Sequence, residues 1–281
     1  MREPEIITSM KNPKVKYALG LRERRERDDT REFLIEGYRE LSRASQAKVA
    51  IDTLFYCSER FLGSNEPTLI AAIQKSGARL FACAPHVFDK LSYRDRPDGL
   101  LAVAKQMGTT LDDLAAQLAK KSEPPLLVVA EAIEKPGNLG TILRSSDAVA
   151  ADGVIVCDRC TDIYNPNVVR ASTGTLFTLP VIEAEGEAAL AWLQKHGIKI
   201  AAATPQADLE FTAADLRGPL AIVVGTEQLG LTWRWIEHAA IKVRIPMLGV
   251  ADSLNVATAT TLLLYEVLRQ RRAGHGVCHG A

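Results

Sequence analysis

Short apolar runs in the second half of the chain constrain its fold more than any other feature of the sequence. They cover residues 126–130, 153–157, 199–203, 220–224 and 241–245. Each run has the length and the β-branched content of a strand, and stretches with helical periodicity separate most of them. Strands as apolar as these are usually buried on both faces. The pattern therefore predicts a largely parallel α/β sheet with helices on both sides.

The first hundred residues predict a second, smaller α/β domain. Strands are expected at residues 33–36, 53–57, 79–83 and 100–104, and helices at residues 38–48 and 68–76. Residues 110–122 read as a short amphipathic helix or a linker, and the pair Pro124-Pro125 makes a stiff boundary. We therefore expect an N-terminal domain over residues 1–107, a linker over residues 108–124 and a C-terminal domain over residues 125–281.

The charge of the chain is balanced, with 34 Lys and Arg residues against 34 Asp and Glu residues. A global basic field of the kind that marks many nucleic-acid binders is therefore absent, and any track for nucleic acid must be local. A basic run near the N-terminus is the candidate for such a track, although acidic residues dilute it: Lys11, Lys14, Lys16, Arg22, Arg24, Arg25 and Arg27. A solvated, charged helix is the alternative.

Cysteine content and hydropathy predict that the protein is located in the reducing cytoplasm. The five cysteines are an odd count without disulfide-framework spacing, and the chain has neither a signal-peptide core nor an apolar stretch of membrane-spanning length. Cys157 and Cys160 form a lone C-x-x-C, and no second pair follows at zinc-like spacing. His275, Cys278 and His279 lie in a Gly-rich tail that is expected to fray. No metal is expected.

Polar loops follow three of the expected C-terminal strands. Asn138 comes after the first run, Gly225 directly after the fourth, and Pro246 directly after the fifth. In a parallel sheet the carboxyl ends of the strands meet at one edge, and ligands usually bind there. We therefore expect the three loops to form one site.

In the first loop, Gly137, Asn138 and Gly140 stand where a strand turns into a helix. Arg144 lies one helical turn after Gly140 and so shares its face. Alternatively, Asn138 caps the helix and Arg144 pairs with Asp147 at the surface. The sequence has neither the G-K-[ST] ending of a P-loop nor the G-x-G-x-x-G pattern of dinucleotide-binding enzymes.

In the second loop, Gly225 permits close approach of the backbone to a ligand, and Gly230 is expected to turn the chain at positive φ. The alternative is a plain strand–loop–helix junction, in which Glu227 lies near the N-terminus of the helix that holds Trp233 and Trp235.

The third loop leads into the last helix of the chain, which is expected to end near residue 272. Asp252 or Ser253 is the predicted N-cap, because a short oxygen side chain can accept a hydrogen bond from the first backbone N–H groups. The consecutive residues 262–264 are all Leu and cover more than one helix face. A helix that is apolar nearly all round is buried, so a second subunit is expected to cover it.

Together the three loops resemble the motifs of the SpoU/TrmH branch of the SPOUT superfamily, RNA ribose 2′-O-methyltransferases that use S-adenosylmethionine. Residues 131–144, 224–231 and 245–257 match the three motifs in the family's order. Residues 7–16 and 33–37 resemble the small substrate-binding domain of many members. The resemblance implies a C-terminal α/β domain with a trefoil knot, a preceding ribosomal-protein-like RNA-binding domain, and a homodimer formed through the last helix.

The resemblance also implies roles for individual residues. The implied catalytic residues are Asn138, Arg144, Glu227, Ser253 and Asn255. The implied binding site for S-adenosylmethionine uses the backbone around Ala203, Thr204, Gly225, Ile245 and Leu254. The implied RNA contacts are Lys11, Lys14, Lys16, Arg24, Arg25 and Arg170. The chain departs from many members at Gln228, where they have Gly, and at Ala257, where they have a small polar residue.

Two roles are open for Arg144 in such a site. It acts either as a general base on the ribose hydroxyl or as a fixed cation beside the phosphate and the developing alkoxide. A guanidinium has a pKa above about 12 and stays charged, which favours the fixed cation. For Arg170, within residues 165–174, an RNA contact and a capped surface helix are both open.

The expected function is therefore methylation of a ribose 2′-hydroxyl in RNA. Ribosomal RNA is the preferred substrate, because the extra N-terminal domain resembles those of rRNA-modifying members, and tRNA is the alternative. A non-catalytic RNA-binding protein of the same fold is a rival, although it would be expected to have lost the polar motif residues. The missing glycine pattern counts against a dinucleotide-binding oxidoreductase.

Overall fold

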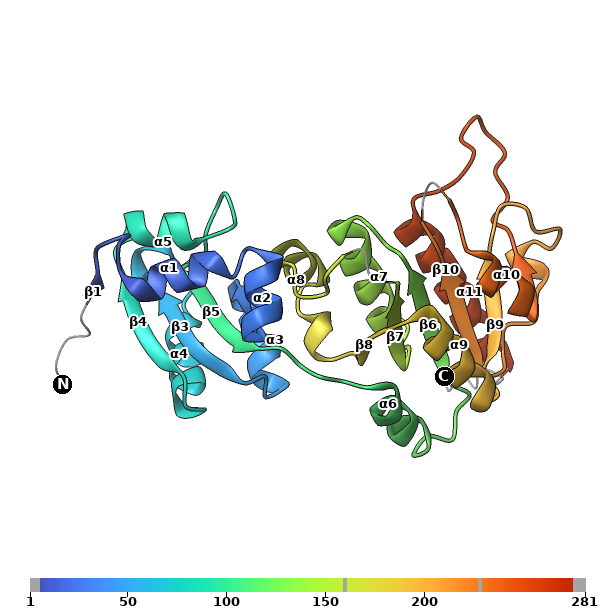
Figure 1. Ribbon diagram of the computed structural model, residues 1–281, viewed down its shortest axis with the longest axis horizontal. Helices are drawn as coiled ribbons and strands as arrows, with labels where there is room; N and C mark the ends of the chain where they lie inside the picture. Colours follow the sequence, from blue (N-terminus) through green and yellow to red (C-terminus); the bar gives the residue numbers. More distant parts are fainter. Residues whose placement is uncertain (1–5, 159–160, 227–228, 275–281) are drawn as a thin grey trace, which may run out of the picture. The chain divides into compact units, whose positions relative to one another are not determined.

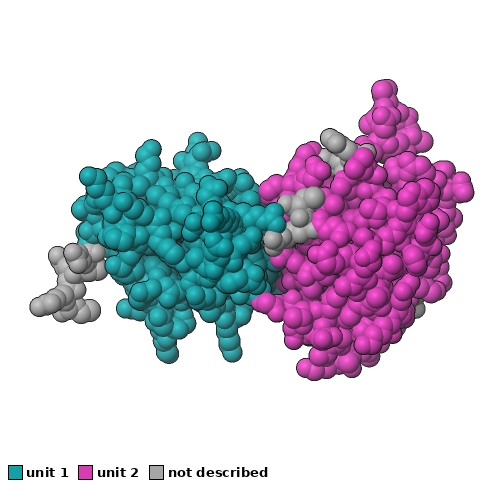
Figure 2. Space-filling model, in the orientation of Figure 1, with its two compact units in different colours: residues 1–107, 162–178 teal, residues 108–161, 179–281 magenta. Residues whose placement is uncertain are grey.

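The computed structural model describes residues 6–158, 161–226 and 229–274. The chain divides into two compact units, which are coloured separately in Figure 2. Unit 1 consists of Met1–Met107 and Asp162–Thr178, and unit 2 consists of Gly108–Thr161 and Leu179–Ala281.

The described strands of unit 1 form a five-stranded mixed sheet in the order β1-β4-β3-β5-β2. β5 runs antiparallel to its neighbours β2 and β3, whereas β4 is parallel to both β1 and β3. The strands are β1 (Ile6–Ile7), β2 (Glu32–Glu36), β3 (Ile51–Tyr56), β4 (Arg79–Cys83) and β5 (Leu100–Lys105). Four of them lie where the apolar runs predict strands.

Helices flank this sheet and follow its strands along the chain (Figure 1). They are α1 (Pro13–Gly20), α2 (Arg24–Thr30), α3 (Tyr38–Gln46), α4 (Glu66–Lys75), α5 (Pro85–Leu91) and α8 (Pro166–Ser172), with short 3₁₀ turns η1 (Ser58–Arg60) and η2 (Thr175–Phe177). One apolar core of the unit joins α1 and α5 to the sheet through Val15, Phe55 and Phe88.

Asp162–Thr178 belongs to unit 1, although we expected it in the C-terminal domain. The ring of Phe33 in β2 lies 4.6 Å from that of Tyr164 and 6.2 Å from that of Phe177. The fully buried Arg27 of α2 donates through Nε to Asp162 Oδ2 at 2.7 Å. Aromatic packing and a buried ion pair thus hold this late segment on the early sheet, which explains the difference from a contiguous division of the chain.

The described strands of unit 2 form a six-stranded sheet in the order β11-β9-β10-β6-β7-β8, and all neighbours are parallel. This confirms the predicted parallel sheet. The strands are β6 (Leu126–Glu131), β7 (Gly153–Cys157), β8 (Val181–Ala184), β9 (Lys199–Ala203), β10 (Leu220–Val224) and β11 (Ile241–Val243).

Helices cover both faces of the unit 2 sheet (Figure 1). They are α6 (Leu111–Leu118), α7 (Pro136–Ala148), α9 (Gly186–Lys195), α10 (Trp233–His238) and α11 (Val256–Gly274), with the 3₁₀ turn η3 (Phe211–Ala213). Helices α6, α9 and α10 pack on one face through Leu114, Leu193 and Trp235. On the other side α11 contacts α7, and it also contacts β10. Within the described ranges, no helix is long and apolar enough to cross a membrane.

Helix α6 occupies the stretch for which we expected a short amphipathic helix or a linker. Thr110 and Asp113 form a capping box at its start, because each side chain accepts a hydrogen bond from the backbone N–H of the other. Leu114 is fully buried in the core of unit 2. This segment is therefore a helical part of unit 2.

Candidate functional site

A cavity of about 1090 Å³ lies at the carboxyl edge of the unit 2 sheet, where β9, β10 and β11 end. All five residues that we expected around the methyl donor line it: Ala203, Thr204, Gly225, Ile245 and Leu254. The strand order explains how they meet, because β9 lies between β11 and β10 and all three strands point the same way. Loops far apart in the sequence thus share one hollow.

The loop after β10 closes on itself next to Gly225. The backbone N–H groups of Thr226 and Gly230 each donate to the other residue's carbonyl oxygen at 3.1 Å. A Cβ atom at position 225 would lie 2.2 Å from the carbonyl oxygen of Gly230. The loop's own backbone therefore fills the space that a side chain at position 225 would need, while Gly225 still lines the cavity in which we expect the ligand. The positive φ predicted for Gly230 is confirmed at +68°.

The buried Glu131, at the end of β6, fixes the next part of this loop. Its carboxylate accepts hydrogen bonds from the Thr232 backbone N–H at 2.9 Å and from Thr232 Oγ1 at 2.7 Å. Arg234 Nη1 lies 3.7 Å from the same carboxylate. Glu131 therefore holds the start of α10 against β6. Sequence reasoning did not assign it a role, although a carboxylate that ends an apolar run was a visible signal.

Asn255 joins the first and third loops. Its Nδ2 donates to Asn138 Oδ1 at 3.0 Å, so two of the expected catalytic side chains are in direct contact. Its Oδ1 accepts from the Ala257 backbone N–H at 3.0 Å, and α11 begins at Val256. Asn255 is thus the N-cap of α11, and our prediction of Asp252 or Ser253 is wrong because the helix starts later than expected.

The two residues that we expected to cap α11 lie at the cavity instead. Asp252 and Ser253 are both exposed and line the cavity, next to Leu254.

The side chain of Ala257, one of the departures from the family pattern, is buried. A polar group at position 257 would therefore lie at the base of α11 and away from solvent. Glu227 and Gln228 lie outside the described residues.

Arg144 is exposed on α7, in the third helical turn of that helix. Within the described ranges its guanidinium has no ion pair or hydrogen bond, so the alternative surface pair with Asp147 is not formed. The neighbouring Ser145 lies within 2.6 Å of Thr261, oxygen to oxygen, and so fixes α7 against α11. Helix α7 is therefore anchored to α11, while the guanidinium of Arg144 is exposed to solvent.

All six residues that we expected to bind RNA belong to unit 1: Lys11, Lys14, Lys16, Arg24, Arg25 and Arg170. Lys14 Nζ lies 4.7 Å from the centre of the Phe81 ring. On α2, Arg24 and Arg25 pair with aspartates one turn later, at 3.6 Å for Arg24–Asp28 and 3.7 Å for Arg25–Asp29. Acidic partners thus offset the basic run on α2. Lys11 and Lys16 are exposed and form no ion pair with any described residue.

Arg170 lies on α8 and is exposed, at a small hollow that Tyr93 and Arg94 also line. Asn165 caps α8, because its Oδ1 accepts from the Asn167 backbone N–H at 2.9 Å. The Asn167 amide donates to Tyr93 Oη at 3.1 Å. The capped helix is therefore present, and it brings Arg170 beside the loop after α5.

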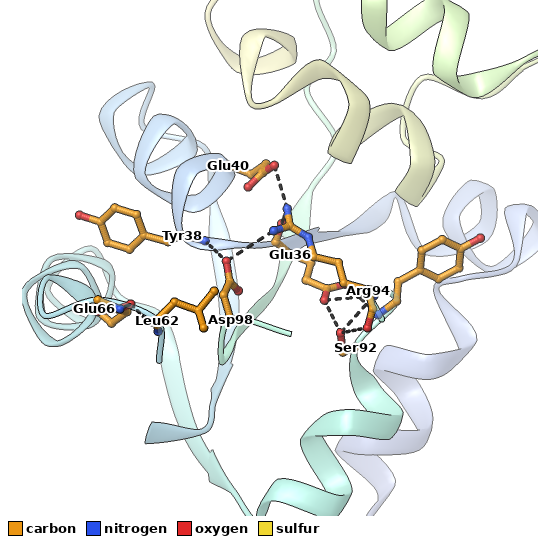
Figure 3. A network of polar contacts seen from close by, with 10 residues as sticks. Glu36, Tyr38, Glu40, Leu62, Glu66, Ser92, Arg94 and Asp98 are labelled. Atoms are coloured by element: carbon orange, nitrogen blue, oxygen red, sulfur yellow. Dashed lines mark hydrogen bonds and ion pairs between the residues drawn. The ribbon is translucent and has the colours of Figure 1, made fainter. Parts of the chain in front are cut away.

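A polar network holds that loop, as Figure 3 shows. Arg94 contacts Glu40 Oε1 at 2.8 Å and Asp98 Oδ2 at 3.5 Å, and it donates to the carbonyl oxygen of Glu36 at 2.9 Å. Asp98 also accepts from the Tyr38 backbone N–H at 2.8 Å. The carboxylates around Arg94 offset its charge, so Arg94 shapes the loop and Arg170 is the more available cation.

No three described His, Cys, Asp or Glu side chains are grouped in a way that could hold a metal ion. Cys157, of the lone C-x-x-C, is buried, and burial raises the pKa of its thiol to about 12. The remaining candidates for metal ligands are outside the described residues: Cys160, His275, Cys278 and His279.

Comparison with protein families matches two parts of the chain. The SpoU rRNA Methylase family model matches residues 125–265, and the MRM3-like substrate binding domain matches residues 12–102. The first match contains all three motif loops, of which the second and the third line the cavity. The second covers most of the sheet of unit 1.

Whole-length relatives agree with these matches. The chain is 33% identical to a 23S rRNA (uridine(2479)-2′-O)-methyltransferase of Streptomyces viridochromogenes, over 91% of this chain and 88% of that protein. An AdoMet-bound rRNA methyltransferase from Sinorhizobium meliloti has a TM-score of 0.85 at 30% identity, covering 94% of this chain and 97% of that one. An RNA 2′-O ribose methyltransferase structure has a TM-score of 0.81 at 41% identity, covering 95% and 100%. The chain belongs to the SpoU rRNA methylase family.

Proposed function

We propose that this protein methylates a ribose 2′-hydroxyl in ribosomal RNA with S-adenosylmethionine as the methyl donor. One observation carries the proposal most directly. The residues implied for the donor come from the second and third motifs and from the loop after β9, and all of them line one cavity of unit 2. Relatives over nearly the whole chain are named 23S rRNA 2′-O-methyltransferases.

The cavity suits the donor by its size and its lining. At about 1090 Å³ it exceeds the range of about 300–1,000 Å³ that is usual for small-molecule sites, so it leaves room for part of a nucleotide. Its wall combines apolar side chains with hydroxyl groups and with the charged Asp208, Lys242 and Asp252. S-adenosylmethionine, when bound, supplies a methyl group on a positively charged sulfonium sulfur.

The chain's own part in the reaction is to position the RNA and to stabilise charge. We assign to Arg144 the role of a fixed cation that binds the phosphate next to the target ribose and stabilises the developing alkoxide. Its exposure supports this role, since RNA can reach it. The general-base role would need a neutral guanidinium, which is rare at neutral pH.

The other motif residues hold this arrangement. The hydrogen bond between Asn255 and Asn138 ties the start of α11 to the first turn of α7, and so links the third loop with the helix that carries Arg144. Ser253 lines the cavity and can donate a hydrogen bond to the ribose or to its phosphate. We also propose a catalytic role for Glu227, in the second motif.

Unit 1 is the proposed RNA-binding part of the protein. It contains all six cations expected to contact RNA, and its match to an MRM3-like substrate binding domain supports the assignment. Arg170 joins this surface through α8. Ribosomal RNA as the substrate implies access to ribosomes or their precursors, so we propose that the protein acts in the cytoplasm.

We further propose that unit 2 has the trefoil knot of its family and that the protein is a homodimer formed through α11. Leu263 and Leu264 are buried within unit 2, whereas Leu262 and Tyr265 are 39% and 50% exposed. Residues three apart lie on the same helix face, so these two form an apolar patch on α11. A second copy of α11 would cover it.

Mapping of the methylated product tests the proposed function. Ribosomal RNA from cells that lack the gene is incubated with the protein and methyl-labelled S-adenosylmethionine, and the RNA is then digested to nucleosides. We expect label in one 2′-O-methylnucleoside and none when the RNA comes from cells that have the gene, because the site is already methylated there. Label on a base would contradict the proposal, and label in tRNA alone would overturn the choice of substrate.

A further inference from the structure

Trp233 differs from the other tryptophans of this chain. It is 76% exposed, whereas Trp235 is 0% exposed and Trp192 is buried. Trp233 also lines the cavity at the carboxyl edge of the unit 2 sheet. A ligand bound in this cavity would bury much of the exposed aromatic surface of Trp233, and such burial favours binding.

The geometry of α10 explains why the two neighbouring tryptophans differ. Residues three apart lie on the same helix face, and accordingly Trp233 and Ile236 both line the cavity. Trp235 lies on the opposite face and packs into the core below the sheet. The buried Glu131 fixes the start of this helix through Thr232, so the orientation of the face is set by the core of the unit.

We propose that Trp233 is a donor-binding residue that stacks on the adenine ring of S-adenosylmethionine. This proposal rests on the proposed function. Adenine is flat and uncharged, and the cavity wall is apolar at Leu229, Trp233 and Ile236. The amino and carboxylate groups at the other end of the donor are charged and need polar partners. An aromatic face is therefore the chemical match for the adenine end.

An RNA base is the other planar group that could stack on this side chain. The reacting end of the site argues against it. Of the residues that we assign to the reaction, Ser253 lines the cavity, whereas Asn138, Arg144 and Asn255 are not among the described residues that line it. Trp233 instead shares the cavity with Thr204 and Gly225, from the loops assigned to the donor. The observations therefore favour the donor over the RNA.

Tryptophan fluorescence and calorimetry test the proposal on the full chain. S-adenosylhomocysteine is the probe, because it keeps the adenosyl group and cannot transfer a methyl group. We expect a fluorescence change on binding to the wild type and none with Trp233→Phe, which keeps an aromatic face and binds within about 3-fold of wild type. Trp233→Ala should weaken binding roughly 5- to 100-fold, the range for loss of one base–aromatic stack.

Leu62→Ala is the matched control, because Leu62 is 78% exposed but lies in unit 1. It should leave the affinity unchanged. Since Trp233 is exposed, Trp233→Ala should melt like the wild type, which separates a binding defect from unfolding. If Trp233→Ala binds the probe as tightly as the wild type, the stacking proposal is wrong, while the proposed function stands. A wild type that does not bind the probe at all would instead refute the proposed function. A fluorescence change caused by RNA and not by the probe would assign Trp233 to the substrate.

Discussion

Substitution of Gly225 by Ala should open the loop that forms one wall of the cavity. The added Cβ would lie 2.2 Å from the Gly230 carbonyl oxygen and 2.8 Å from the Leu231 backbone nitrogen. The contacted atoms belong to backbone, so no flexible side chain can move aside and the loop itself must shift. The shift breaks the two hydrogen bonds between Thr226 and Gly230. Each contributes about 1 kcal/mol net, so their loss costs about 2 kcal/mol.

If donor binding requires the closed loop, this cost appears in the affinity as a loss of about 30-fold. Isothermal titration with S-adenosylhomocysteine measures it. Gly249→Ala, in the third loop, is the matched control, because a Cβ there meets no atom within 4 Å. Gly230→Ala isolates the effect of backbone strain, because Gly230 has a φ of +68° but open space around it. An unchanged affinity in folded Gly225→Ala protein would show that donor binding does not depend on the closed loop.

Further predictions concern assembly and stability. Tyr265→Glu should convert the dimer to a monomer, which sedimentation would detect as a halved mass, and a wild-type monomer at micromolar concentration would contradict the proposed interface. Arg27→Ala should lower the free energy of unfolding by about 3–5 kcal/mol in a denaturant titration, because it removes the ion-pair partner of the buried carboxylate of Asp162. The control is Arg25→Ala at an exposed ion pair, which should change the free energy of unfolding by less than about 1 kcal/mol. The hydrogen bond from Arg269 lowers the pKa of Glu266. The ionised carboxylate therefore stabilises the fold above its ordinary pKa and loses this effect as the pH falls, so Glu266→Gln should lower the melting temperature at neutral pH and hardly at acid pH.

The parallel sheet of unit 2 was predictable because its strands are buried on both faces and therefore read as unbroken apolar runs. β8 (Val181–Ala184) was missed, since it is short and contains Glu183. The convergence of Gly225 and Ile245 on one cavity was also predictable, because parallel strands bring their carboxyl ends to a single edge. In these cases the apolar pattern of a short segment determines where that segment and the loop after it lie in the fold.

The remaining features depend on contacts between distant residues. Asp252, Ser253 and Asn255 all have side chains that can cap a helix, and only the path of the chain decides that Asn255 does so. The packing of Tyr164 against Phe33 joins residues more than a hundred positions apart, and no periodicity indicates it. Long-range packing of this kind is what moved Asp162–Thr178 into unit 1.

The proposed ribose methyl transfer depends on the cation of the first motif, Arg144. Single-turnover methylation of ribosomal RNA by Arg144→Ala, with 2′-O-methylnucleoside as the readout, tests this claim. We predict a rate about 100- to 1,000-fold below wild type, as for loss of one group that stabilises a developing oxyanion, with donor affinity unchanged. Arg144→Lys should stay slow at all pH values if Arg144 is a fixed cation with bidentate contacts, whereas rescue at high pH would assign it as a general base. A near-normal rate for Arg144→Ala would contradict the claim.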